Sequence, residues 1–223
     1  MKFLLPLLAS SGLASAAIFG SPTTHTKPDS WGGSVSLGPS KSTIINAVTT
    51  IIPGTAPSTQ NGELFLWPGM SNGTGDLIQT TLESWPDNSW CGATTGQWCV
   101  RASVFGSFGQ LDGTASPVSG SEKVRIEYNL ESDGETWKQT VTNADTGALL
   151  STYSRASGPY MTCDCTGTIA AQQCLNTTIT LASADTTFGS TIATAQSATY
   201  TGLKSSQNGK VWVIDTINIP SMS

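Results

Sequence analysis

The side chains best suited to chemistry in this sequence are those of Trp, Gln, Glu and Arg residues in segments rich in β-branched residues. On a β-strand, alternate positions share a face, so one face carries core residues and the other is free for a site. We expect such faces to line one groove that binds an extended neutral polymer, either peptide or polysaccharide. Indole rings stack on apolar groups or sugar rings, and amides supply directional hydrogen bonds. The candidate substrate-binding residues are Trp67, Arg125, Trp137 and Gln139.

The charge balance excludes several other classes of function. Only 11% of the 223 residues are charged, against roughly 25% in a typical domain, and the net charge is -5. Nucleic acids and anionic membrane surfaces need clustered Lys and Arg, so we expect neither as a partner. The single histidine, His25, precedes the first strand-like segment. A histidine-based triad or a multi-histidine metal site is therefore not expected, and we predict no metal and no cofactor.

The N-terminal residues resemble a secretory signal peptide. Lys2 precedes an apolar stretch that ends at the small-x-small sequence Ala14-Ser15-Ala16. We therefore predict a signal peptide over residues 1–16, a polar leader over 17–30 and one domain over 31–223. A secreted, extracellular protein is expected, and we expect it to be a monomer. The candidate N-glycosylation sites are Asn72 and Asn176, each in an Asn-x-Thr sequence.

Five cysteines in a secreted chain should mostly be oxidised. Cys91 and Cys99 are eight positions apart across two glycines and can close a hairpin loop. Cys174 can pair with Cys163 or with Cys165 around a second short loop, which leaves one cysteine over. Zinc binding at Cys163-x-Cys165 is the alternative, but zinc-ligand pairs usually have two to four residues between them. The candidate disulfide residues are Cys91, Cys99, Cys165 and Cys174.

Strands and turns account for the whole pattern of apolar residues. Residues 124–130 alternate apolar and polar side chains, and Asp133-Gly134 is a hairpin turn signal directly after them. Residues 63–67 and 76–82 are strand-like and flank a glycine-rich turn. Strands recur at the roughly 8–12-residue spacing of an all-β sandwich or barrel. The sequence therefore predicts one large all-β domain.

The order of several segments resembles the eqolisins, a family of secreted fungal glutamic peptidases. The resemblance covers most of residues 31–200, and order and spacing carry it more than any one motif. It is strongest in six segments: Trp31-Gly32-Gly33-Ser34-Val35, residues 47–53, the stretch from Trp67 to Gly73, Leu77-Ile78-Gln79-Thr80, residues 118–150 and Phe188-Gly189-Ser190. The resemblance implies a concanavalin-like, two-sheet antiparallel jelly-roll sandwich.

The family also implies a catalytic pair, a glutamine and a glutamate on neighbouring strands of the concave face. The glutamate activates a water and later protonates the leaving amine, while the glutamine stabilises the oxyanion. Gln79 matches the family glutamine, but Thr177 stands where the family has its glutamate. Glu127 is our candidate for the replacement carboxylate, because its strand face is opposite the apolar one.

Three hypotheses follow. The first is a divergent acid hydrolase of the peptidase type that uses Gln79 and Glu127. The second is a non-catalytic or carbohydrate-active jelly-roll protein that binds cell-wall glycans through Trp67 and Trp137. The third is a structural surface protein whose groove has no activity.

Overall fold

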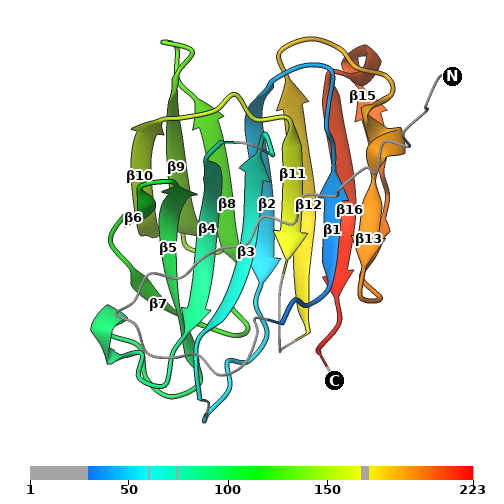
Figure 1. Ribbon diagram of the computed structural model, residues 1–223. Coiled ribbons are helices and arrows are strands. Elements are labelled where there is room, and N and C mark those ends of the chain that lie inside the picture. The colour runs from blue at the N-terminus through cyan, green and yellow to red at the C-terminus, as the bar shows by residue number, and fades with distance from the viewer. Residues whose placement is uncertain (1–29, 60, 74, 167–170, 223) are drawn as a thin grey trace, which may run out of the picture.

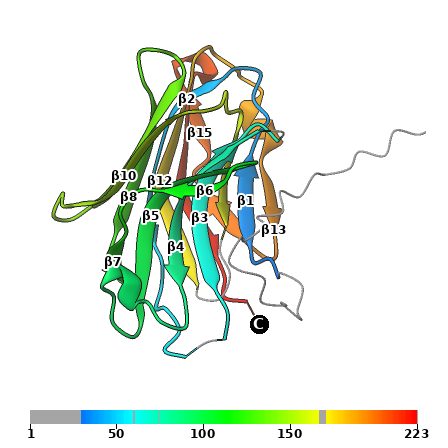
Figure 2. The ribbon, with the colours of Figure 1, turned by 60° about the vertical axis from the view of Figure 1, so that its left-hand side comes forward.

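Two antiparallel β-sheets lie face to face in this protein, as Figure 1 and Figure 2 show from two directions. The computed structural model describes residues 30–222 except 60, 74 and 167–170. The predicted signal peptide, residues 1–16, and the leader up to residue 29 lie outside the described residues. The predicted all-β, two-sheet sandwich is confirmed.

Sheet A has eight strands, all of whose pairings are antiparallel. Its order is β13-β1-β11-β3-β4-β5-β6, and β7 pairs with β5 outside this path. The strand bounds, in this order, are Ala193–Ala195, Ser34–Leu37, Thr162–Thr166, Leu64–Ser71, Leu77–Ser84, Gln97–Gly106, Gly109–Asp112 and, for β7, Ser116–Ser119.

Sheet B also has eight strands, in the order β10-β9-β8-β2-β12-β16-β14, with β15 paired to β16 outside this path. The bounds, in this order, are Leu149–Ala156, Thr136–Asn143, Val124–Leu130, Ile44–Ile52, Gln172–Leu181, Val211–Ile219, Thr199–Thr201 and, for β15, Lys204–Ser206. Three single-turn 3₁₀ helices, η1 to η3, occupy Ser89–Cys91, Phe188–Thr191 and Gln207–Gly209.

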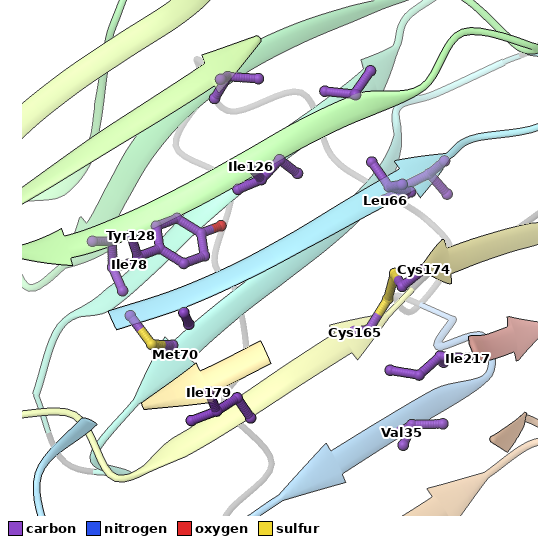
Figure 3. Close-up of a cluster of buried hydrophobic side chains, with 14 of the residues drawn as sticks. Val35, Leu66, Met70, Ile78, Ile126, Tyr128, Cys165, Cys174, Ile179 and Ile217 are labelled. Atoms are coloured by element: carbon purple, nitrogen blue, oxygen red, sulfur yellow. A yellow bond between two sulfur atoms is a disulfide. The ribbon is translucent and has the colours of Figure 1, made fainter. Parts of the chain in front are cut away.

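The hydrophobic core lies between the inner faces of the two sheets, where long strands such as β8 and β9 place every second side chain (Figure 3). On β8, Val124, Ile126 and Tyr128 are buried, and the alternate residues of the strand are partly exposed. On β4 every residue is buried, including those on its outer face. The outer face of β4 is therefore unusual in this sandwich, and it carries the candidate catalytic glutamine.

Both predicted disulfides are present. Cys91–Cys99 links η1 to β5, with an S–S distance of 2.03 Å. Cys165–Cys174 joins β11 of sheet A to β12 of sheet B across the core (Figure 3). Cys163, two residues before Cys165 on β11, is half-buried and belongs to neither disulfide.

Candidate functional site

Gln79 lies in the middle of β4 with its side chain on the outer face of sheet A. Its neighbours Ile78 and Thr80 are buried on the inner side, since the core includes Ile78 and the core hydroxyl of Tyr128 reaches the Thr80 backbone. Although Gln79 lies on an outer face, it is only 4% exposed. It pairs with Gly69 of β3 on one side and with Ser103 of β5 on the other.

Gly69 keeps the space beside Gln79 narrow and free of a side chain. A methyl group at position 69 would lie 3.3 Å from Cβ of Gln79 and 3.2 Å from Cε3 of Trp67. It would also lie 2.8 Å from the carbonyl oxygen of Ile78, which is too close for an ordinary contact. Trp67, a predicted substrate-binding residue, is half-buried on β3 and borders the same space as Gln79.

A carboxylate that we did not select from the sequence falls in the same row of sheet A. Asp164 of β11 pairs with Gly69, and Gly69 pairs with Gln79. Residues paired in register lie on the same face of a sheet, so the Asp164 position faces the same side as Gln79. Two strand spacings of about 4.8 Å each separate the positions of Asp164 and Gln79 along this row. Asp164 lies between Cys163 and Cys165 in the sequence, and alternation along a strand places its position on the face opposite to theirs. This alternation could have indicated Asp164 from the sequence.

The row continues to a second carboxylate on the far side of Gln79. Ser103 of β5 pairs with Asp112 of the edge strand β6. Asp112 accepts hydrogen bonds from Gln110 and Arg101, both at 2.8 Å. Burial raises the pKa of Asp112 above the ordinary value, and it outweighs the opposite effects of Gln110 and Arg101.

Arg101 of β5 forms ion pairs both with Asp112 of β6 and with the fully buried carboxylate of Glu83 on β4. Its Nε and Nη2 donate to the two carboxylate oxygens of Glu83 at 2.7 and 3.0 Å. Glu83 also accepts from Thr81 and from the indole of Trp85. One guanidinium is therefore shared by two carboxylates, and the three side chains link β4, β5 and β6 on this side of the sheet.

The hydroxyl of Tyr128, from sheet B, fixes the backbone directly behind Gln79. Direct pairing between β3 and β4 is interrupted between the Leu66–Leu82 and Gly69–Gln79 pairs, where Pro68 lacks an N–H group. Tyr128 Oη accepts from the Thr80 N–H at 2.8 Å and donates to the Pro68 carbonyl at 2.7 Å. Burial raises the pKa of Tyr128, so the hydroxyl stays protonated and able to donate. Figure 3 shows Tyr128 among the core side chains, near Ile78.

The structure does not bring Glu127 or Arg125 to Gln79. Both residues lie on the outer face of β8 in sheet B, whereas Gln79 lies on the outer face of sheet A. Glu127 accepts from Arg125 at 2.8 Å and from Asn46 at 3.2 Å. These hydrogen bonds lower its pKa even though partial burial opposes them. The predicted pairing of Gln79 with Glu127 is therefore wrong, because the sandwich separates them.

Trp137 and Gln139 are core residues, so their predicted place in a binding groove is also wrong. They are 1% and 0% exposed on the inner face of β9, which they share with Val141. Trp137 packs edge-on against Tyr160, and Gln139 Nε2 donates to the Ser103 carbonyl at 2.7 Å. The amide of Gln139 thus supports the strand next to Gln79 from inside the core.

Thr177 does not lie beside Gln79 either. It is buried on β12 of sheet B, where its hydroxyl lies 2.8 Å from that of Thr49. The strand whose sequence resembles the family's glutamate-bearing strand therefore belongs to sheet B, whereas Gln79 lies in sheet A. Its neighbour Asn176 is exposed at an irregularity of β12, with a φ of 52°, and Asn72 follows β3. Glycosylation of Asn72 and Asn176 remains a prediction.

The described residues contain no group of three or more His, Cys, Asp or Glu side chains arranged to hold a metal ion. Among these residues, no helix is long and apolar enough to cross a membrane.

Comparisons with known proteins agree with the fold. No family model matches the sequence, and no curated protein matches it. Among solved structures, a scytalido-glutamic peptidase with a peptide-based transition-state analogue is similar, with 14% identity and a TM-score of 0.51 over 86% of this chain and 98% of that one. The same peptidase with a transition-state analogue inhibitor is similar with 12% identity and a TM-score of 0.53, over the same shares of the two chains. SCP-B, an eqolisin in complex with the tripeptide Ala-Ile-His, gives 13% and 0.51, again over 86% and 98%. This chain therefore has the fold of the glutamic peptidases.

Proposed function

We propose that this protein is a secreted hydrolase that cleaves peptide bonds on the outer face of sheet A, with Gln79 and Asp164 as its catalytic residues. The observation that carries the proposal is the row in which both residues pair with the same glycine, Gly69. The fold shared with peptidases that bind peptide analogues supports the substrate class. The two disulfides support an oxidising, extracellular environment.

In the proposed reaction, the Asp164 carboxylate takes a proton from a water molecule, and the water oxygen forms a bond to the carbonyl carbon of the peptide. The Gln79 side-chain N–H groups donate to the oxyanion that develops. The C–N bond then breaks as protonated Asp164 gives its proton to the leaving amine, which regenerates the carboxylate. The products are a carboxylic acid and an amine, and the proposed steps use only these side chains and water.

Peptide is the better-supported substrate class on this face. A glycan platform was predicted from two tryptophans, but Trp137 is buried in the core and only Trp67 remains beside Gln79. An extended peptide does not depend on stacking, and its carbonyl can be attacked by a water molecule that a carboxylate activates while an amide stabilises the oxyanion.

The test is release of peptides from a denatured protein between about pH 2 and 7, with wall polysaccharides assayed in parallel. Gln79→Ala and Asp164→Asn should each lower the rate of peptide release by about 100-fold or more. The matched control is Glu127→Gln, the same kind of change on the opposite face, which should leave the rate within about 2-fold.

Asp112→Asn separates the two carboxylates in the row. If peptide release depends on Asp112 and not on Asp164, the assignment of the catalytic carboxylate is wrong. Release that survives Gln79→Ala, or cleavage of polysaccharide alone, would overturn the proposed function.

A further inference from the structure

One arginine of this protein has no carboxylate partner. The sequence contains three arginines, and two of them, Arg101 and Arg125, form the ion pairs described above. Arg155 of β10 is half-buried, yet within the described part of the chain its side chain forms neither an ion pair nor a hydrogen bond. Burial of a charge is costly unless the charge is paired, so folded proteins rarely leave a partly buried arginine without a partner. The positive charge of Arg155 is therefore available to an anionic ligand.

The guanidinium group of Arg155 lies against the ring of Phe108. Phe108 is in the turn between β5 and β6, and Cζ of Arg155 is 4.1 Å from the centroid of its ring. Since β10 packs along β5, these strands and β6 lie together at one side of the molecule (Figure 1). Stacking on the ring restricts the orientation of the guanidinium plane. The ring is itself 38% exposed, so this pair of side chains borders solvent.

The guanidinium group presents one edge to solvent. Its Nε is buried without a hydrogen-bond partner among the described residues, whereas the two terminal nitrogens, Nη1 and Nη2, are not buried in this way. The accessible edge is therefore the one between Nη1 and Nη2, which carries two parallel N–H groups. Two parallel donors match the two oxygens of a carboxylate, and such bidentate pairs are stronger than single neutral hydrogen bonds. The edge thus suits a planar anion with two oxygens.

Asp76 limits the charge that this anion can carry. Burial raises the pKa of Tyr160, and among the smaller effects Asp76 raises it and Arg155 lowers it, so both charges lie near this ring. Asp76 does not pair with Arg155, and its Oδ2 instead accepts a hydrogen bond from Ser157 at 2.8 Å. The charge of Asp76 and the net charge of -5 both oppose a doubly charged anion such as phosphate. A singly charged carboxylate meets less repulsion.

We propose that Arg155 and Phe108 form a carboxylate-binding site at the edge of the sandwich. The terminal nitrogens of Arg155 donate to the two carboxylate oxygens, while the exposed ring of Phe108 contacts the apolar group next to the carboxylate. The ligand's carboxylate is a peptide C-terminus or an acidic side chain. Arg155 belongs to the edge strand β10 of sheet B, whereas Gln79 lies in sheet A, so this site does not rest on the proposed peptidase function.

Titration of the full chain with N-acetylalanine, followed by nuclear magnetic resonance, tests the site. The backbone amide signals of residues 106–109 should shift in a saturable way. N-acetylalanine amide, which lacks the carboxylate, should bind at least about 10-fold more weakly. N-acetylglutamate α-amide carries its carboxylate on the side chain only, so its Kd distinguishes the two sources of the carboxylate. Arg155→Gln should weaken the Kd of the tighter acid by about 10-fold or more, and Phe108→Leu by about 2–5-fold.

Arg125→Gln is the matched control, because Arg125 is also partly exposed but is already paired with Glu127. It should leave the Kd unchanged. Phe108→Leu alters an exposed ring in a turn, so it tests the site even where Arg155→Gln fails to fold. Equal binding of N-acetylalanine and its amide, or an unchanged Kd in both Arg155→Gln and Phe108→Leu, would show that there is no carboxylate site here. If inorganic phosphate binds more tightly than either acid, the ligand class is wrong.

Discussion

At the scale of single residues, one hydroxyl group holds the backbone on which Gln79 depends. Tyr128 Oη takes the place of a direct bond between Thr80 and Pro68. We predict that Tyr128→Phe lowers the free energy of unfolding by about 1–3 kcal/mol, because the Thr80 N–H and the Pro68 carbonyl both lose a buried partner. Urea titration measures the change, and peptide release should fall as well, since Gln79 adjoins Thr80.

Tyr153→Phe on β10 is the control, since it removes a hydroxyl from a tyrosine of sheet B that is only partly buried. This substitution should change the free energy of unfolding by no more than about 0.5 kcal/mol. Equal effects of the two substitutions would show that the Tyr128 hydroxyl has no special role behind β4.

The sequence predicted which residues share a face better than which face is buried. It grouped Trp137 with Gln139 correctly, but Val141 on the same face is apolar, and the three together enter the core. Gln139 can be buried with the other two because its amide nitrogen donates a hydrogen bond to the Ser103 carbonyl. Alternation within a strand cannot reveal that partner, because it lies on the other sheet.

At the scale of strands and sheets, local patterns gave the strands and missed their arrangement. The alternation over residues 124–130 matches the bounds of β8, and the expected turn at Gly134 precedes β9. Sheet membership depends on pairings between residues far apart in the chain, such as Gly69 with Asp164. For this reason Gln79 and Glu127 were predicted to converge, although the sandwich places them on opposite faces.

The Cys165–Cys174 disulfide links the two sheets, and Cys165 follows Asp164 directly. Its loop is nearly as long as that of Cys91–Cys99, with separations of 9 and 8 residues. We predict that replacing either pair with serine lowers the free energy of unfolding by about 2–4 kcal/mol, as measured by urea titration. Only loss of Cys165–Cys174 should lower peptide release at temperatures where both variants are folded. Equal losses of activity would contradict a role for β11 in the site.

At the scale of the whole molecule, the scarcity of charge limits how strongly stability depends on acid. Hydrogen bonds lower the pKa values of Asp87, Asp133 and Asp185, and they do the same for Glu127 against the effect of its burial. The stability that these groups contribute is present when the pH is above the ordinary carboxyl pKa values. It is lost as the pH falls through the lowered pKa values of the folded state. The pKa of Asp112 is raised by burial, so its contribution has the opposite sign and is lost as the pH rises.

Alkaline pH should be the harsher condition, because two tyrosines are buried in the core with raised pKa values. Burial raises the pKa of Tyr160 to about 12, with a smaller effect from Asp76, and a hydrogen bond with Ser157 opposes the rise. The unfolded chain ionises near the ordinary tyrosine pKa of 10.0, below the folded value. Stability is therefore complete below pH 10 and falls as the pH rises towards 12, by about 2 kcal/mol for Tyr160 alone. Tyr160→Phe should lose less stability than the wild type between about pH 9 and 12, as measured by urea titration at each pH. Parallel losses in the two proteins would show that Tyr160 keeps an ordinary pKa in the folded state.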